Sequence, residues 1–139
     1  MEYVKLNNGI EMPLISFGVY QIPKEDTKRC VLDAIKSGYR GIDTAQSYFN
    51  ESEVGDAIVE CGVPREELFI TTKVWIDHYG YEECKASVEE SLRKLKTDYF
   101  GTLDEGQKKS LRELFDNYIS GFDKSVPINK LRGEIYAEA

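Results

Sequence analysis

The sequence predicts an α/β fold: a truncated (β/α) barrel fragment, with an N-terminal hairpin, about three parallel strand–helix units and an α-helical C-terminal tail. Short apolar segments alternate with amphipathic ones, which is typical of parallel strands covered by helices. No glycine-rich nucleotide-binding loop follows any expected strand, so a barrel is favoured over a dinucleotide-binding sheet. The 139 residues are also well short of the roughly 250 that a complete barrel takes.

The first unit begins with a hairpin. Residues 4–12 place Asn-Gly between two extended segments, which is the strongest short signal for a hairpin. Residues 14–18, LISFG, predict a short buried strand. A helix is expected over residues 25–37, with Gly38 ending it in a left-handed conformation. Its apolar face would consist of Val31, Leu32, Ala34 and Ile35.

The second unit consists of a strand in YRGID, residues 39–43, and a helix that starts near Asn50. Asn50 and Glu53 have the spacing of a capping box, in which the Asn side chain accepts a helix N–H and the Glu reaches back. Glu51 and Glu53 are interpreted as first-turn acids that the helix dipole favours, without a chemical role. Gly62 is expected to close this helix.

The third unit starts with LFITTKVW, residues 68–75, whose β-branched and aromatic residues predict a strand. A third helix would bury a stripe formed by Cys84, Val88, Leu92 and Leu95. Residues such as Ile42 and Ile70 are expected to line the barrel interior. An open sandwich, with helices on both faces of a three-stranded sheet, is the alternative arrangement.

Residues 101–139 predict two amphipathic helices, the first opened by a capping box at Thr102 and Glu105. We therefore expect two parts, a partial barrel over residues 1–100 and a helical tail over residues 101–139. The apolar stripe of the tail must be buried, either on the open half of the barrel or on another chain. We therefore expect the chain to form a homo-oligomer, through either the exposed barrel half or the tail.

Composition narrows the function classes. The net charge of −7 lacks the basic footprint that nucleic-acid binding needs. No apolar run is long enough for a membrane span, and the N-terminus does not read as a signal peptide. The three cysteines, Cys30, Cys61 and Cys84, form no C-x-x-C pair, which argues against a metal site and suits a reducing cytoplasm.

Three segments carry a family resemblance. GYRGIDTAQSYFNESEVGDAI, FITTKVW and SLRKLKTDY resemble the aldo-keto reductases, and an N-terminal hairpin is also typical of that family. The pattern D-T-A-x-x-Y-x-N-E, followed by T-T-K on the next strand, is the most specific part. The resemblance runs from about residue 1 to Tyr99. It implies an eight-stranded barrel that reduces carbonyl groups with NADP(H).

The resemblance also implies roles for individual residues. Tyr48 would be the general acid, Lys73 the cation that stabilises its phenolate, and Asp43 the carboxylate that keeps Lys73 charged and aimed. These roles agree with elementary chemistry, because a free phenol titrates near pH 10 and releases its proton readily only beside a positive charge. Trp75 would line the substrate pocket, with core packing as the alternative.

The family's fourth catalytic residue is a His after its fourth strand, and here TDYFGTLDEG stands in that place. The only histidine, His78, follows the third strand and is interpreted as an exposed loop residue. Two hypotheses follow. The chain is an aldo-keto reductase-derived enzyme, inactive or very weak alone because the His and most of the NADP(H) site are missing. Alternatively, it is a non-catalytic barrel fragment whose tail drives folding or self-association.

Overall fold

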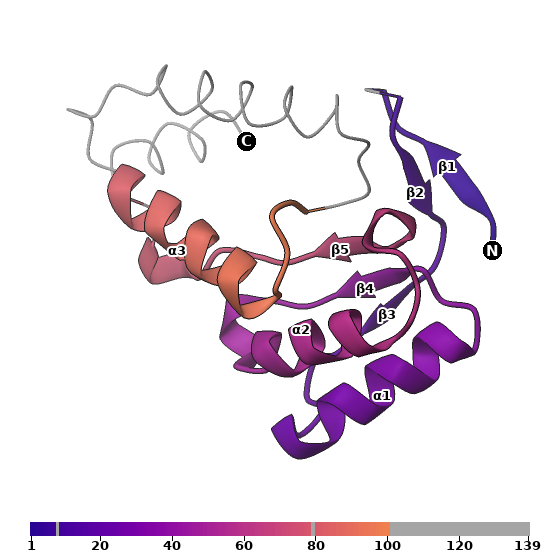
Figure 1. Ribbon diagram of the computed structural model, residues 1–139. Helices are drawn as coiled ribbons and strands as arrows, with labels where there is room; N and C mark the ends of the chain where they lie inside the picture. Colours follow the sequence, from indigo (N-terminus) through magenta and orange to yellow (C-terminus); the bar gives the residue numbers. More distant parts are fainter. Residues whose placement is uncertain (8, 79, 101–139) are drawn as a thin grey trace.

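The computed structural model describes residues 1–7, 9–78 and 80–100 (Figure 1). The strands are β1 (Tyr3–Lys5), β2 (Glu11–Pro13), β3 (Ser16–Gly18), β4 (Gly41–Asp43) and β5 (Phe69–Thr71). The α-helices are α1 (Lys24–Lys36), α2 (Glu51–Glu60) and α3 (Tyr81–Lys94), and the short 3-10 helices are η1 (Gln46–Tyr48), η2 (Arg65–Glu67) and η3 (Ile76–His78). The helices expected in residues 101–139, and the tail as a separate part, lie outside the described residues.

The N-terminal hairpin is confirmed. Strands β1 and β2 pair antiparallel, with Val4 opposite Met12, and Gly9 between them adopts a φ of 86°. This left-handed conformation is the one that glycine supplies in a tight turn. In Figure 1 the hairpin lies beyond the end of the sheet where β4 and β5 begin, so it does not contribute to the opposite end of the sheet.

Strands β3, β4 and β5 form a parallel sheet in that order, with Ile42 aligned to Phe17 and to Ile70. Helices α1 and α2 pack together on one face of this sheet (Figure 1). Ile42 and Ile70 are fully buried in the core that these helices form, together with Val31, Ile35 and Val54. The expectation that Ile42 and Ile70 line the barrel interior is therefore wrong, and the strand–helix alternation is confirmed.

The strands are shorter than the sequence predicts. Leu14 and Ile15 are each 59% exposed, and β3 starts only at Ser16, so the first apolar run is not a buried strand over its whole length. Strand β5 ends at Thr71, which leaves residues 72–75 outside the regular strand. The segment that contains Lys73 and Trp75 must therefore be held by contacts other than regular strand pairing.

Helix α1 buries the predicted face, and Gly38 follows it with a φ of 101°. Helix α3 does so only in part. Leu95, the last residue of the predicted stripe, is fully buried, but Val88 and Leu92 are half-buried, and the buried residues within the helix are Ser87 and Ser91. The two serines face a polar partner, Gln46, which accounts for the rotation of the buried stripe relative to the apolar one.

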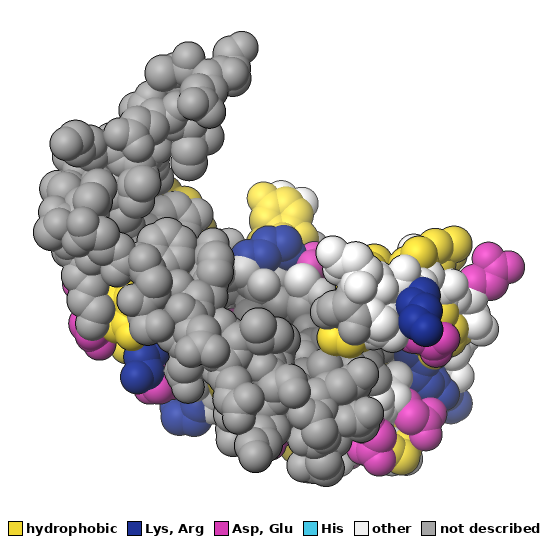
Figure 2. Space-filling view, turned by 90° about the horizontal axis from the view of Figure 1, so that it is seen from above, with side chains coloured by type: hydrophobic (Ala, Val, Ile, Leu, Met, Phe, Trp, Pro, Cys, Tyr) yellow, Lys and Arg dark blue, Asp and Glu magenta, His cyan; other side chains and the backbone are white. Residues whose placement is uncertain are grey.

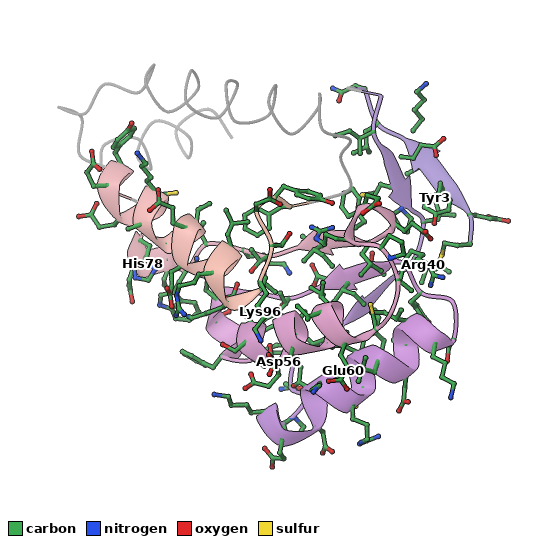
Figure 3. All side chains as sticks on the ribbon, in the orientation of Figure 1. Tyr3, Arg40, Asp56, Glu60, His78 and Lys96 are labelled. Carbon is green, nitrogen blue, oxygen red and sulfur yellow. The ribbon has the colours of Figure 1, made fainter. Side chains whose placement is uncertain are left out.

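Charges on the described surface are mostly paired. On the face seen in Figure 2, Lys and Arg side chains lie next to Asp and Glu side chains. Ten ion pairs form among the described residues, including Lys28 with Glu60 and Lys96 with Asp56. Figure 3 shows Lys96 and Asp56 reaching toward one another from the end of α3 and from α2. Across the described residues, no helix combines the length and hydropathy of a membrane span.

Candidate active site

The predicted catalytic residues gather where the parallel strands end. Asp43 is the last residue of β4 and is aligned with Thr71 on β5. Lys73 lies two residues beyond Thr71. Tyr48 closes η1, the short helix that follows β4. In a sheet of parallel strands the carboxyl ends lie at one edge, which is where functional groups of α/β proteins converge. The structure thus brings all three residues to the same end of the sheet.

Lys73 and Asp43 form a close ion pair. The Lys73 Nζ donates to both carboxylate oxygens of Asp43, at 2.7 and 2.8 Å, and also to the backbone carbonyl of Thr44 at 3.0 Å. Their side chains are 50% and 35% exposed, so the pair is not the buried one that a closed core would contain. Water screens part of its attraction, and an approaching ligand can reach both groups.

Tyr48 lies beside this pair. The Lys73 Nζ is 5.3 Å from the centroid of the Tyr48 ring, within the range of a cation–π contact. On its other side, the Tyr48 ring packs against Tyr20 with centroids 4.9 Å apart. Sequence reasoning missed Tyr20, which is 64% exposed and follows β3, although an aromatic residue just after a strand end was a usable signal.

Trp75 does not pack in the core. Its side chain is 38% exposed and its indole N–H donates to Asp77 at 2.9 Å. It lines a cavity of about 480 Å³ between η1, the loop after β5 and α3, together with Gln46, Phe49 and His78. This exposed position rules out the core-packing alternative. It is compatible with contact to a substrate, which stays a prediction.

His78 is exposed, as expected for a loop residue. It lies in η3, at the end of the sheet where the strands finish (Figure 3). Its Nδ1 is 3.5 Å from the Gln46 Oε1, and the two residues line the same cavity. Within the described part of the chain, no group of His, Cys, Asp and Glu side chains could hold a metal ion.

The prediction of a capping box at Asn50 and Glu53 is wrong. The Asn50 side chain makes no bond to the start of α2. Instead its Nδ2 donates to the Val19 carbonyl at 3.1 Å and to the Thr27 hydroxyl at 3.3 Å, and its Oδ1 accepts from Thr44 at 3.3 Å. Asn50 is 1% exposed, so it joins the ends of β3 and β4 to α1 from within the interior. The local N-x-x-E spacing could not reveal these distant partners.

Glu51 is more than a first-turn acid. It is 2% exposed, and its Oε1 accepts a hydrogen bond of 2.7 Å from the Thr72 hydroxyl, next to Lys73. The Lys94 Nζ lies 3.9 Å from the other carboxylate oxygen. Glu53 does not reach back to Asn50 either, since it pairs with Lys24 at 3.5 Å. Buried carboxylates are rare unless they have a partner, and Thr72 and Lys94 serve Glu51 in this way. The sequence around Glu51 gives no sign that its side chain is buried.

Comparisons with known proteins agree with this geometry. The model of the Aldo/keto reductase family matches residues 14–104. The glyoxal reductase of Bacillus subtilis is 52% identical over 97 residues, which cover 69% of this chain and 35% of that protein. The chain spans about a third of the length of the curated relatives that it matches.

Solved structures give the same result. A crystal structure of an aldo/keto reductase from Brucella melitensis superposes with a TM-score of 0.69 at 44% identity, over 71% of this chain and 38% of that one. A Bombyx mori aldo-keto reductase in complex with NADP gives a TM-score of 0.69 at 30% identity, over 81% of this chain and 47% of that one. Since the family model matches most of the sequence, the chain belongs to the aldo/keto reductase family.

Proposed function

We propose that residues 1–100 supply the Asp–Tyr–Lys part of an active site that reduces aldehydes or ketones with NADPH. The observation that supports this best is the position of the Lys73 ammonium, 2.7 Å from Asp43 and 5.3 Å from the ring centre of Tyr48. All three groups lie at the end of the sheet where the strands finish, and the pair is open to solvent. This arrangement suits a general acid that must meet an incoming carbonyl group.

In this mechanism Tyr48 donates its phenolic proton to the carbonyl oxygen of the substrate as negative charge develops there. The phenolate that remains lies close to the Lys73 ammonium, which stabilises it by Coulomb attraction. Asp43 holds that ammonium through both carboxylate oxygens, and the Thr44 carbonyl fixes its third direction. NADPH, when bound, supplies the hydride that reduces the carbonyl carbon.

The described residues fit only the reacting end of this cofactor. Asp43 and Lys73 are exposed enough to face a nicotinamide ring, but no glycine-rich loop for the pyrophosphate follows β3, β4 or β5. The sequence also has one histidine, His78, whose ring contacts Gln46 rather than Tyr48. We therefore propose that turnover by these 139 residues alone is very weak and that they bind NADPH loosely.

A second candidate is a non-catalytic role, in which the chain folds or self-associates through residues 101–139 and the open end of the sheet. The position of His78 favours it, because the only histidine of the sequence contacts Gln46 rather than Tyr48. In that case the Asp43–Lys73 ion pair persists as an inherited surface contact.

Titration with NADPH separates the two candidates. Trp75 is the only tryptophan and lies near Lys73, so its fluorescence reports on cofactor binding at this end of the sheet. We expect quenching only as NADPH approaches millimolar concentration. Lys73→Met should abolish it, whereas Lys36→Met, an exposed change at the end of α1, should keep it. Loss of NADPH absorbance with glyoxal as substrate measures turnover. No quenching at millimolar NADPH refutes the enzyme proposal.

Self-association is measured separately by size-exclusion chromatography with light scattering. The second candidate predicts a dimer or larger assembly that dissociates when residues 101–139 are deleted. A monomer whose far-UV circular dichroism and urea midpoint survive that deletion contradicts it.

A further inference from the structure

Gln46 connects three parts of the molecule. Its backbone N–H donates to the Lys73 carbonyl at 3.2 Å, and its side-chain Oε1 accepts from the Trp75 backbone N–H at 2.7 Å. Its Nε2 donates to the Ser87 carbonyl at 3.0 Å and to the Ser91 hydroxyl at 2.9 Å, both on α3. One half-buried side chain therefore joins the turn after β4, the segment after β5 and a helix more than forty residues away.

These contacts matter because of where Lys73 and Tyr48 lie. Strand β5 ends at Thr71, so Lys73 lies beyond the regular strand pairing. Tyr48 lies two residues after Gln46 in η1. The two bonds from Gln46 to Lys73 and Trp75 thus link the backbone of the segment that carries the cation to the turn that carries the phenol.

Glu51 makes a further contact to this segment through the Thr72 side chain, in addition to the bonds of the Lys73 side chain to Asp43 and Thr44. It fixes the segment on the side facing α2, whereas Gln46 fixes the backbone on both sides of Val74. Because Ser91 is 1% exposed and Ser87 is 9% exposed, the two bonds to α3 are shielded from water. Shielded hydrogen bonds hold position better than exposed ones.

We propose that Gln46 is a positioning residue, which sets the separation between the Lys73 ammonium and the Tyr48 ring and couples it to helix α3. The kinetic consequence rests on the proposed function, whereas the structural one does not. Misplacement of a reacting group by about 1 Å can lower a rate about a hundredfold. Movement of α3 would reach the site through the same side chain.

Three variants of the full 139-residue chain test this. Gln46→Leu removes every side-chain hydrogen bond at similar size. Gln46→Glu keeps an oxygen that accepts from the Trp75 N–H but cannot donate to Ser87 and Ser91. Ser91→Ala removes one contact to α3 and leaves Gln46 intact.

The first readout is exchange of the Trp75 backbone amide, followed by heteronuclear NMR. We expect Gln46→Leu to speed it about tenfold or more, since a hydrogen bond of roughly 1.4 kcal/mol corresponds to a factor of ten. Gln46→Glu and Ser91→Ala should each speed exchange only about threefold, because both keep the acceptor for the Trp75 N–H and lose contacts to α3. Unchanged exchange in Gln46→Leu overturns the proposal. If Gln46→Leu fails to fold, unchanged exchange in Ser91→Ala does so.

The second readout is NADPH-dependent reduction of glyoxal. We expect Gln46→Leu to lower kcat about ten- to a hundredfold with little change in KM, and Gln46→Glu to recover most of the kcat. Equal losses in both variants indicate a role in stability alone and overturn the positioning role. If the wild-type chain shows no turnover, the proposed function fails, and the exchange experiment still decides the role of Gln46.

Discussion

The change Asn50→Asp distinguishes a helix cap from a buried connector. Asp is at least as good as Asn at a helix N-terminus, and its charge interacts favourably with the helix dipole. If Asn50 acted as a cap, the substitution would be neutral or slightly stabilising. The structure predicts the opposite, because the Asn50 Nδ2 donates to Val19 and Thr27 and a carboxylate cannot donate.

The magnitude follows from the contacts that are lost. Two hydrogen bonds disappear, at 3.1 and 3.3 Å, and the buried Val19 carbonyl then faces a carboxylate oxygen. Leaving one buried polar group without a partner costs about 1–3 kcal/mol, and burying a charge adds to that. We therefore expect Asn50→Asp to lower the free energy of unfolding by about 3 kcal/mol or more at neutral pH.

Urea unfolding followed by far-UV circular dichroism measures this. With a slope of about 1–3 kcal/mol per molar urea, the midpoint should fall by about 1 M or more. Asn7→Asp, at an exposed position of the hairpin, is the matched control for the added charge and should change the midpoint little. A midpoint for Asn50→Asp equal to or above that of the wild type would refute the buried-connector interpretation.

Three other changes test the fold and the site. Gly55→Ala should destabilise by about 1–3 kcal/mol, despite the roughly 1 kcal/mol that alanine gains in helices, because its Cβ would lie 2.9 Å from the Leu95 backbone; urea unfolding checks the sign. Asp43→Asn should lower kcat for glyoxal about a hundredfold, since Lys73 loses its carboxylate, and an unchanged kcat would contradict that role. The hydrogen bond from Lys96 lowers the pKa of Asp56, so its stabilisation is present above the ordinary carboxyl pKa of 3.8 and is lost as the pH falls through the lower folded value. Asp56→Asn should therefore flatten the acid side of the stability–pH curve, and an unaltered curve would exclude this contribution.

The elements whose signals are local were predictable from sequence. The Asn-Gly turn, the face of α1 and the left-handed glycines at 38 and 62 depend on neighbours within a few residues, and all are found in the structure. Sequence failed where the partner is distant. Asn50 and Glu51 read as helix-start residues, yet their side chains bond to Val19 and Thr72, thirty-one and twenty-one positions away.

Helix α3 shows the same limit in another form. An apolar stripe predicts the buried face only when the surface opposite is apolar, and here the opposing residue is Gln46. The helix therefore buries Ser87 and Ser91, whose backbone carbonyl and hydroxyl, respectively, accept from the Gln46 amide, and leaves Val88 and Leu92 half-buried. A buried amide needs its hydrogen bonds more than the helix needs full burial of two aliphatic side chains.

The proposed catalytic pair of Asp43 and Lys73 shows why part of the site could be derived from strand parity. Successive side chains of a strand point to opposite faces, and Ile42 and Ile70 face the helices. Asp43 and its aligned partner Thr71 must then face the other side, and Lys73, two residues after Thr71, returns to it. Tyr48 follows no such rule, because it lies in η1, beyond the end of β4. Parity alone therefore accounts for the Asp43–Lys73 contact, whereas the place of Tyr48 beside them depends on a turn that the contacts of Gln46 hold in position.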